Sequence, residues 1–292
     1  MSNDNPRAIL LMVVSMAAFA FEDFFIKKAS FGLPIGQIIL ILSIGGAVIF
    51  GTLCKVRGAP LISRDFAHPL VVARNVAEVL ATVCYVSSLA LIPLSLLAAI
   101  LQATPLVVTV GAALWLKEDV GWRRWLAVLI GLVGVLIILR PGFEGFRPEA
   151  LLALLATFGL AARDLASRRI PATIPSPQLA WWAYLCMLPA GAALNAFTGG
   201  FTHASGEAWG LLAMAMIIGA VAYASLIAAT RIGDVSAVIP FRYSRLIFAL
   251  AIGVVLLGER PDALTLIGAA IVVSSGLYAW LRERRRANAP AA

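Results

Sequence analysis

The sequence predicts an all-α integral membrane protein with ten transmembrane helices, arranged as two inverted five-helix repeats. Three observations lead to this fold class. Charged residues make up only 13% of the 292-residue chain, against about a quarter in soluble domains. The apolar residues gather in segments of roughly twenty, the length at which a helix crosses a bilayer. The chain also matches itself when it is shifted by the 141 positions that separate Asp23 from Asp164.

The first half contains five apolar segments that are closed by turn-forming or charged residues. Gly32 to Pro34 separate the first two segments, and Gly58 to Pro60 separate the second from the third. Only Ile92 and Pro93 separate the third from the fourth, which predicts a tight helical hairpin. The predicted helices cover residues 8–27, 35–54, 70–91, 94–116 and 122–139.

The second half contains five more segments of the same kind. Pro141 and Gly142 lead into it, and Pro171 to Pro177, Gly199–Gly200 and Arg260–Pro261 mark later breaks. The predicted helices cover residues 149–167, 178–198, 207–229, 235–257 and 261–281. The first segment of the chain is too long for a signal-peptide core, so it is predicted to remain as a membrane helix.

An internal repeat relates the two halves. In a chain that is 61% hydrophobic, apolar matches carry little weight, whereas matches of rarer residues carry more. The matched pairs are Asp23 with Asp164, Lys27–Lys28 with Arg168–Arg169, Pro34 with Pro175, Gln37 with Gln178, Ser95 with Ser236, and Glu118 with Glu259. We therefore expect one repeat over residues 1–141 and a second over residues 142–292, which ends in a short basic tail.

The number of helices in each repeat fixes how the repeats are related. Because five is odd, the second repeat must enter the membrane from the opposite side, so the two are related by a pseudo-two-fold axis in the membrane plane. Transporters built in this way bind their substrates near the midplane, between the repeats, and work by alternating access.

The basic residues of the loops predict the orientation, because cytoplasmic loops are richer in lysine and arginine. Ten spans place both termini on one side. That side would carry fourteen basic residues: Arg7, Lys55, Arg57, Arg64, Lys117, Arg123, Arg124, Arg168, Arg169, Arg231, Arg282, Arg284, Arg285 and Arg286. The other side would carry five: Lys27, Lys28, Arg140, Arg147 and Arg260. Both termini are therefore expected in the cytoplasm.

Several functional classes find no support in the sequence. The net charge of +8 does not indicate nucleic-acid binding, because the basic residues lie mostly between apolar segments. Cys54, Cys84 and Cys186 have no metal or disulfide spacing. His68 and His203 are predicted in loops, outside any metal-binding pattern. No nucleophile–base set or phosphate loop is present, so we expect neither an enzyme nor a cofactor or metal site.

Short motifs then indicate a family. The first copy holds Pro93-Leu94-Ser95, Ala103-Thr104-Pro105 and Leu116-Lys117-Glu118, and a helix with Gly131 that ends in Arg140-Pro141-Gly142. The second copy holds Gly233-Asp234-Val235-Ser236 and Leu257-Gly258-Glu259-Arg260, then Gly268 and Gly276. Over essentially its whole length the chain resembles the EamA-type repeats of the drug/metabolite transporter superfamily.

The resemblance implies a central cavity lined by the first four helices of each half, with the fifth and tenth helices at the periphery. The glycines Gly131, Gly134, Gly268 and Gly276 are expected to pack these outer helices. The second copy departs from the first, because it has Leu246 where the first has Pro105 and places Arg242 and Arg245 nearby. Many relatives have an apolar cavity, so these arginines suggest a more polar cargo.

Eight ionisable residues fall within predicted helices, where each costs about 2.5–3.5 kcal/mol on insertion scales and so needs a reason. They are Glu22, Asp23, Arg74, Glu78, Arg163, Asp164, Arg242 and Arg245. At about 1.5 Å per residue, Glu22 and Asp23 are expected towards the outer side and the other six between the cytoplasmic edge and the middle. One hypothesis is a charged site for substrate, since a guanidinium suits a carboxylate or phosphate. The other is mutual neutralisation, with Glu78 or Asp164 as the chief acid partners of Arg242 and Arg245.

The substrate-binding residues predicted on this basis are Arg242, Arg245, Glu78, Tyr85, Arg74, Gln102, Tyr243 and Ser244. Glu22, Asp23, Arg163 and Asp164 form a second set, predicted to act in proton coupling or gating. Two simpler alternatives stay open, namely that Asp23 pairs with Lys27 four residues later, and that Arg163 and Asp164 reach the cytoplasmic face. Glu118 and Glu259, at helix ends, are better explained as caps or ties between helices.

These expectations combine into a secondary-active transporter of the bacterial inner membrane. Its partners would be the lipid bilayer and a small polar metabolite, zwitterionic or anionic, such as an amino acid or a derivative, with export favoured. One alternative is uptake of a cofactor-like metabolite by the same fold. Another is a membrane scaffold or receptor that does not transport, whose intramembrane charges would all be paired with one another.

Overall fold

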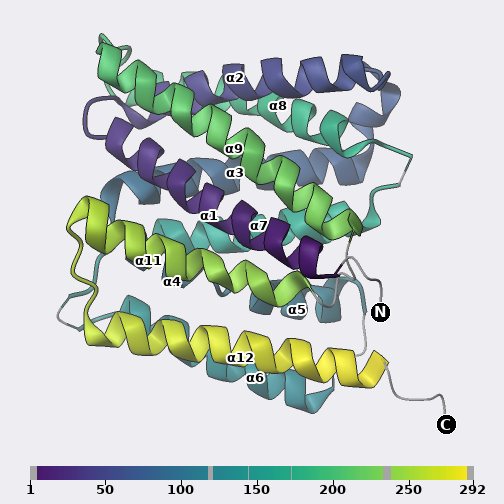
Figure 1. Ribbon diagram of the computed structural model, residues 1–292, viewed down its shortest axis with the longest axis vertical. Helices are drawn as coiled ribbons and strands as arrows, with labels where there is room; N and C mark the ends of the chain where they lie inside the picture. Colours follow the sequence, from purple (N-terminus) through teal and green to yellow (C-terminus); the bar gives the residue numbers. More distant parts are fainter. Residues whose placement is uncertain (1–4, 118–120, 144, 172, 233–237, 288–292) are drawn as a thin grey trace. The chain divides into compact units, whose positions relative to one another are not determined.

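The computed structural model describes residues 5–117, 121–143, 145–171, 173–232 and 238–287, which are helical almost throughout (Figure 1). Within these residues there is no β-strand. Ten helical spans in this part of the chain are long and apolar enough to cross a membrane. They overlap the ten predicted segments one by one, so the all-α membrane fold is confirmed.

The helices of the first half are α1 (Asn5–Ala29), α2 (Ile35–Val56), α3 (Pro69–Leu91), α4 (Leu94–Leu101), α5 (Thr104–Trp115) and α6 (Trp122–Leu139). Those of the second half are α7 (Ala150–Arg169), α8 (Ser176–Phe197), α9 (Gly206–Ile232), α11 (Ser244–Leu257) and α12 (Ala263–Ala287). Two short 3₁₀ helices, η1 (Arg64–Ala67) and η2 (Ile239–Tyr243), complete the described elements.

Proline, glycine and left-handed residues set the helix boundaries. Pro34 precedes α2 and Pro175 precedes α8, both with extended backbone. At the other ends, α6 stops at Arg140 with φ +51°, and α11 stops at Gly258 with φ +67°. A left-handed residue turns the chain away from the helix axis and ends the run of helical hydrogen bonds.

The fourth span is interrupted, which the sequence analysis did not predict. Residues 94–116 were expected as one helix, but the helix breaks between Leu101 and Thr104. Pro105 has no backbone N–H to offer the carbonyl of Leu101, and the Thr104 hydroxyl donates to that carbonyl instead at 2.6 Å. The ninth span changes from the 3₁₀ helix η2 to α11 at Ser244, which is the repeat equivalent of Ala103 within that break.

The chain forms two compact units that cut across its two sequence halves. Unit 1 consists of residues 1–24, 92–151 and 218–292, and unit 2 consists of residues 25–91 and 152–217. Each unit therefore combines helices from both halves. The repeat boundary near residue 141 stays a prediction from the sequence.

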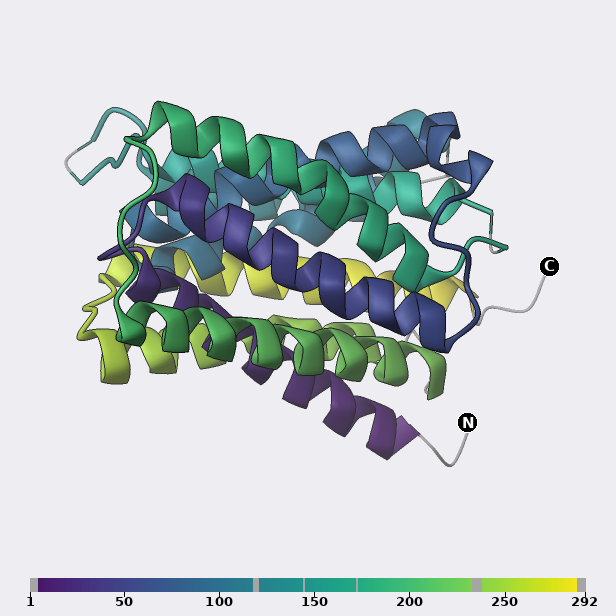
Figure 2. The same ribbon diagram turned by 90° about the horizontal axis from the view of Figure 1, so that it is seen from above.

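In unit 2, α2 runs beside α8, its equivalent in the other repeat (Figures 1 and 2). Gly36 at the start of α2 lies against the backbone of Asn195 at the end of α8, so the two helices are antiparallel, as an inverted repeat requires. Gln37 bonds to both the N–H and the carbonyl of Thr202 after α8, and Gln178 donates to the Pro60 carbonyl after α2. The matched glutamines thus anchor matching loops.

In unit 1, α6 and α12 pack along each other through glycines (Figure 1). A Cβ atom on Gly134 would lie 2.9 Å from the carbonyl oxygen of Gly268, and one on Gly268 would lie 2.7 Å from that of Gly134. Gly131 faces Leu106, and Gly276 faces the ring of Tyr243. All four predicted packing glycines thus have close neighbours, while apolar side chains such as Leu129, Val133 and Ile267 are exposed.

Candidate functional site

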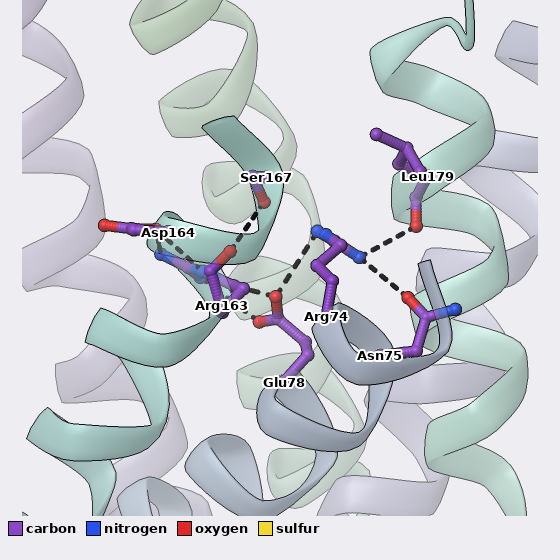
Figure 3. A network of polar contacts seen from close by, with 7 residues as sticks. All are labelled: Arg74, Asn75, Glu78, Arg163, Asp164, Ser167 and Leu179. Atoms are coloured by element: carbon purple, nitrogen blue, oxygen red, sulfur yellow. Dashed lines mark hydrogen bonds and ion pairs between the residues drawn. The ribbon is translucent and has the colours of Figure 1, made fainter. Parts of the chain in front are cut away.

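Four ionisable residues meet in unit 2 and form the charged cluster: Arg74, Glu78, Arg163 and Asp164 (Figure 3). Arg74 and Glu78 are four residues apart on α3, which places them on one helix face. Arg163 and Asp164 lie on α7. The two helices approach closely at Gly159, where an added Cβ would lie 2.8 Å from that of Ala81, so short side chains let the longer ones meet.

Glu78 and Arg163 hold the charged cluster together. The Glu78 carboxylate lies 3.3 Å from Arg74 Nη2 and 3.2 Å from Arg163 Nη1. Arg163 also donates from Nη2 to Asp164 at 2.7 Å. Two guanidinium groups and two carboxylates give the charged cluster no net charge, and its side chains are between 12% and 29% exposed. It is therefore neutral and partly accessible, although it lies in apolar spans.

Two further groups hold Arg74, and sequence reasoning missed both. Arg74 donates from Nη1 to Oδ1 of Asn75 and to the carbonyl of Leu179 on α8, each at 3.0 Å (Figure 3). Asn75 is 3% exposed, and its side-chain nitrogen has no hydrogen-bond partner among the residues that the structure describes. The sequence does show an asparagine next to an arginine in an apolar segment, which indicates a polar site within a helix. Nothing in the sequence indicates the contact with the carbonyl of Leu179.

A second pair of charges lies in unit 1. Arg245 on α11 donates from Nη2 to Oδ2 of Asp23 on α1 at 2.7 Å, and its guanidinium stacks over Phe19 with 5.3 Å to the ring centroid. The expectation that Glu78 or Asp164 would be the main acid partner of Arg245 is wrong, since the partner is Asp23. Lys27, the alternative partner for Asp23, donates to the carbonyl of Leu89 at 2.8 Å.

The ion pair joins the side chains of two residues that were expected at different depths in the membrane. The depth estimate assumed a uniform α-helical rise of about 1.5 Å per residue. Residues 239–243 form a 3₁₀ helix, which rises about 2.0 Å per residue and carries Arg245 farther along the span. The long side chain of Arg245 spans a further part of the expected difference in depth between the two residues.

The remaining predicted residues take three positions. Gln102, at the break between α4 and α5, donates to the carbonyl of its repeat equivalent Tyr243 at 3.2 Å. Arg242 is exposed at the end of η2, and Ser244 donates to the carbonyl of Phe241. Tyr85 lies farther along α3, about two turns beyond Glu78.

Glu259 follows the end of α11 and caps another helix, as the sequence favoured. Its carboxylate accepts from the backbone N–H of Leu94 at 2.5 Å and from the N–H and hydroxyl of Ser95 at 2.9 and 2.6 Å. These are the free donors at the start of α4, where a negative charge is also favoured by the helix dipole. The matching residue Glu118 lies outside the described residues.

The geometry is that of a membrane protein with polar sites inside its spans, and comparison with known proteins identifies its family. The sequence profile of the EamA-like transporter family matches residues 6–140 and again residues 147–279. The chain belongs to the EamA-like transporter family. It is therefore a multi-pass membrane protein of a family of transporters, and the resemblance inferred from its motifs is confirmed.

Relatives within this EamA-like group have different named cargoes. The chain is 29% identical over 218 residues to a riboflavin transporter of Rhizobium johnstonii, covering 75% of this chain and 72% of the relative. It is 25% identical to an S-adenosylmethionine uptake transporter of Rickettsia felis, covering 76% and 74%. It is also 25% identical to the pseudopaline exporter CntI of Pseudomonas aeruginosa, covering 91% and 93%.

A solved crystal structure shares the fold. It covers 96% of this chain and 99% of its own, with a TM-score of 0.65 and 20% sequence identity. At this identity the likeness concerns the fold alone.

Proposed function

We propose that this EamA-like protein is a secondary-active transporter of small polar metabolites. Each of these metabolites would carry a carboxylate, and the zwitterionic ones would also carry an ammonium group. The observation that carries the proposal is the charged cluster of unit 2 (Figure 3). Its arginines are suited to a carboxylate and its acids to an ammonium group, so a dipolar cargo can replace both sets of internal partners.

A site in which the charged groups of the cargo replace the ion-pair partners within the protein is suited to transport. Removing charges from water is costly, and an ion pair inside the protein offsets that cost while no cargo is bound. A cargo with both charges restores the same contacts, so the bound and empty sites differ little in electrostatic free energy. The partial exposure of the four side chains supports access from water.

The loops and the relatives support a proposal for the location and the direction of transport. We propose the bacterial inner membrane with both termini in the cytoplasm, because the basic loop residues favour that side fourteen to five. Export is supported by the exporter that aligns over 91% of the chain, although an uptake transporter aligns over 76%. Single cysteines at positions 3 and 290, labelled in intact spheroplasts and after lysis, test the orientation; reaction in intact spheroplasts would contradict it.

A binding screen followed by flux measurement tests the cargo class. The probes are the twenty standard L-amino acids, riboflavin and S-adenosylmethionine, tested by thermal shift on purified protein. Labelled forms of the compounds that bind are then tested in proteoliposomes. Binding by one or more of the amino acids is expected. Binding by riboflavin alone, which has no carboxylate or ammonium group, would contradict this cargo class and favour the cofactor-like alternative.

Variants connect the flux to the charged residues. Glu78→Gln leaves the charged cluster with a net positive charge and should abolish flux of a zwitterion. Arg242→Ala, at an exposed position, should also abolish flux while leaving the melting temperature nearly unchanged. The matched control is Arg147→Ala, an exposed loop residue outside the spans. Normal flux in Glu78→Gln would eliminate the charged cluster as the cargo site, and normal flux in Arg242→Ala would eliminate a cargo role for Arg242.

The paired charges also fit a membrane scaffold or receptor, since mutual neutralisation is what such a protein requires. The ion pairs of the charged cluster in unit 2 and the Asp23–Arg245 pair have this character. A scaffold would give no flux for any probe in proteoliposomes, whereas the transporter gives saturable flux. Membership of a transporter family supports the second outcome.

A further inference from the structure

Two acidic residues stand side by side on α1, and the structure gives them different surroundings. Asp23 is buried and accepts from Arg245 at 2.7 Å. Glu22 makes no hydrogen bond or ion pair to any residue that the structure describes. It is partly buried in the C-terminal half of a helix that is long and apolar enough to cross a membrane.

The carboxylate of Glu22 lies against the backbone of α9 at a glycine. A Cβ atom on Gly219 would lie 2.5 Å from Oε1 and 2.8 Å from Cδ of Glu22. The Ser15 hydroxyl, two turns earlier on α1, donates to the carbonyl of Ala222 at 2.7 Å and fixes α1 against this part of α9. Figure 1 draws α1 between α9 and α11, which supplies Arg245. The carboxyl group of Glu22 therefore occupies the space that the missing side chain of Gly219 leaves open.

The charges that face Glu22 are few. Asp23 on its own helix acts against a second negative charge, and Arg245 on α11 acts in favour of it. At its contact on α9 stands Gly219, which carries no side chain. With a proton on Glu22, the charges of Asp23 and Arg245 cancel, and the three groups together carry no net charge. Without that proton, the three groups carry one net negative charge in a poorly solvated place.

We propose that Glu22 is a proton-binding site through which this transporter is coupled to the proton gradient. The proton is taken from water and bound by a carboxylate oxygen, and it returns to water when the site is hydrated in the other state of the transport cycle. The neighbouring Asp23 is held in an ion pair with the Arg245 guanidinium. The coupling rests on the proposed transport function, whereas proton binding rests on the geometry alone.

Infrared spectroscopy of the protein in lipid nanodiscs, without any cargo, tests proton binding. A protonated carboxylic acid has a carbonyl band that disappears as the acid is titrated. We expect a titrating band that is lost in Glu22→Gln and kept in Glu207→Gln, a variant of an exposed glutamate on α9. A band of unchanged intensity in Glu22→Gln would overturn the proposal. Because glutamine has nearly the shape of the protonated acid, this variant should fold.

A pair of glycine variants on α9 tests the seat of the carboxyl group. Gly219→Ala places a methyl group where Glu22 now lies, so the infrared band should shift in frequency and in titration midpoint. Gly210→Ala is the matched control, because an added Cβ there has no neighbour within 4 Å. A spectrum of Gly219→Ala that matches that of Gly210→Ala would contradict this position for Glu22.

Proton counting tests the coupling. An L-amino acid that binds the wild type is added to weakly buffered protein, and a pH-indicator dye reports the protons released or taken up. The number should differ from zero in wild type and fall to zero in Glu22→Gln that still binds. An equal number in both proteins would overturn the coupling. If no compound binds while the infrared band is lost in Glu22→Gln, the cargo class fails and the proton site stands.

Discussion

Arg245 Nη2 and Asp23 Oδ2 are 2.7 Å apart, and this ion pair joins α11 to α1 across 222 positions of the chain. The Asp23 side chain is only 5% exposed. The contact therefore compensates a largely buried charge, and it is a structural element of unit 1 whatever the cargo is.

Removal of either member of this pair should lower stability. Arg245→Gln and Asp23→Asn are each expected to reduce the free energy of unfolding by about 3–5 kcal/mol, because one charge then loses its compensating partner. The double variant should lose less than the sum of the two, since it leaves no uncompensated charge. Thermal melting of the four proteins in one detergent measures this cycle. Strictly additive losses would show that the pair is not coupled.

The glycine contact between α6 and α12 should not tolerate a larger residue. In Gly134→Leu the side chain would meet the carbonyl of Gly268 and the side chain of Val272, so a loss of about 1–3 kcal/mol is expected from overpacking. Substrate preference should be unchanged. Gly210→Leu, where the space is open, is the control for the substitution itself. A Gly134→Leu protein with normal stability but altered selectivity would place these helices at the cargo site.

The Glu259 cap should contribute measurably to stability. Glu259→Ala removes the acceptor of three hydrogen bonds from Leu94 and Ser95, and loss of a cap costs about 0.5–2 kcal/mol. Ser95→Ala, which removes only the hydroxyl bond, should have a smaller effect. Hydrogen exchange of the first amides of α4 gives a local readout. Unchanged exchange there in Glu259→Ala would contradict the capping role.

The pairing of Asp262 with Arg140 should make stability depend on pH in the acid range. Burial raises the pKa of Asp262, but the Thr265 N–H at 2.8 Å and the Arg140 guanidinium outweigh it, and the pKa falls below its ordinary value of 3.8. Below that value the unfolded chain therefore binds the proton more readily than the folded one. The stabilisation is present above pH 3.8 and is lost as the pH falls through the folded-state value.

Comparison of wild type with Asp262→Asn measures this contribution. The variant should melt at a lower temperature at pH 7, and the difference should shrink below pH 4, as the wild-type carboxyl is protonated. The effect should be small, because the Asp262 side chain is 56% exposed. A melting difference that stays constant from pH 7 to pH 3 would contradict the assignment.

The sequence was sufficient for properties that depend on local composition. Length and hydropathy predicted all ten spans, because a helix in lipid must satisfy its own backbone and bury its apolar side chains at any position in the fold. The roles of Glu259 and of Gly134 were also predictable. An acid at a helix end and a glycine in an apolar helix have few alternative uses.

Properties that depend on how helices assemble were not predictable. The partner of Arg245 was missed because hydropathy gives neither the lateral order of helices nor their relative depth, and both decide which acid an arginine can reach. The interruption at Gln102 was missed because a proline in a membrane helix can be accommodated with or without a break. Gly219 gave no signal at all, since its importance lies in the side chain that it admits.

The distribution of each unit over both halves of the chain has a consequence for synthesis. Asp23 enters the membrane early, but Arg245 is made 222 residues later. At about 5–20 residues per second, translation leaves the aspartate without this arginine for roughly 10–45 s. Over that interval the first helix must be shielded by the insertion machinery or by water, and a chain truncated after its first half would keep the acid and never receive the base.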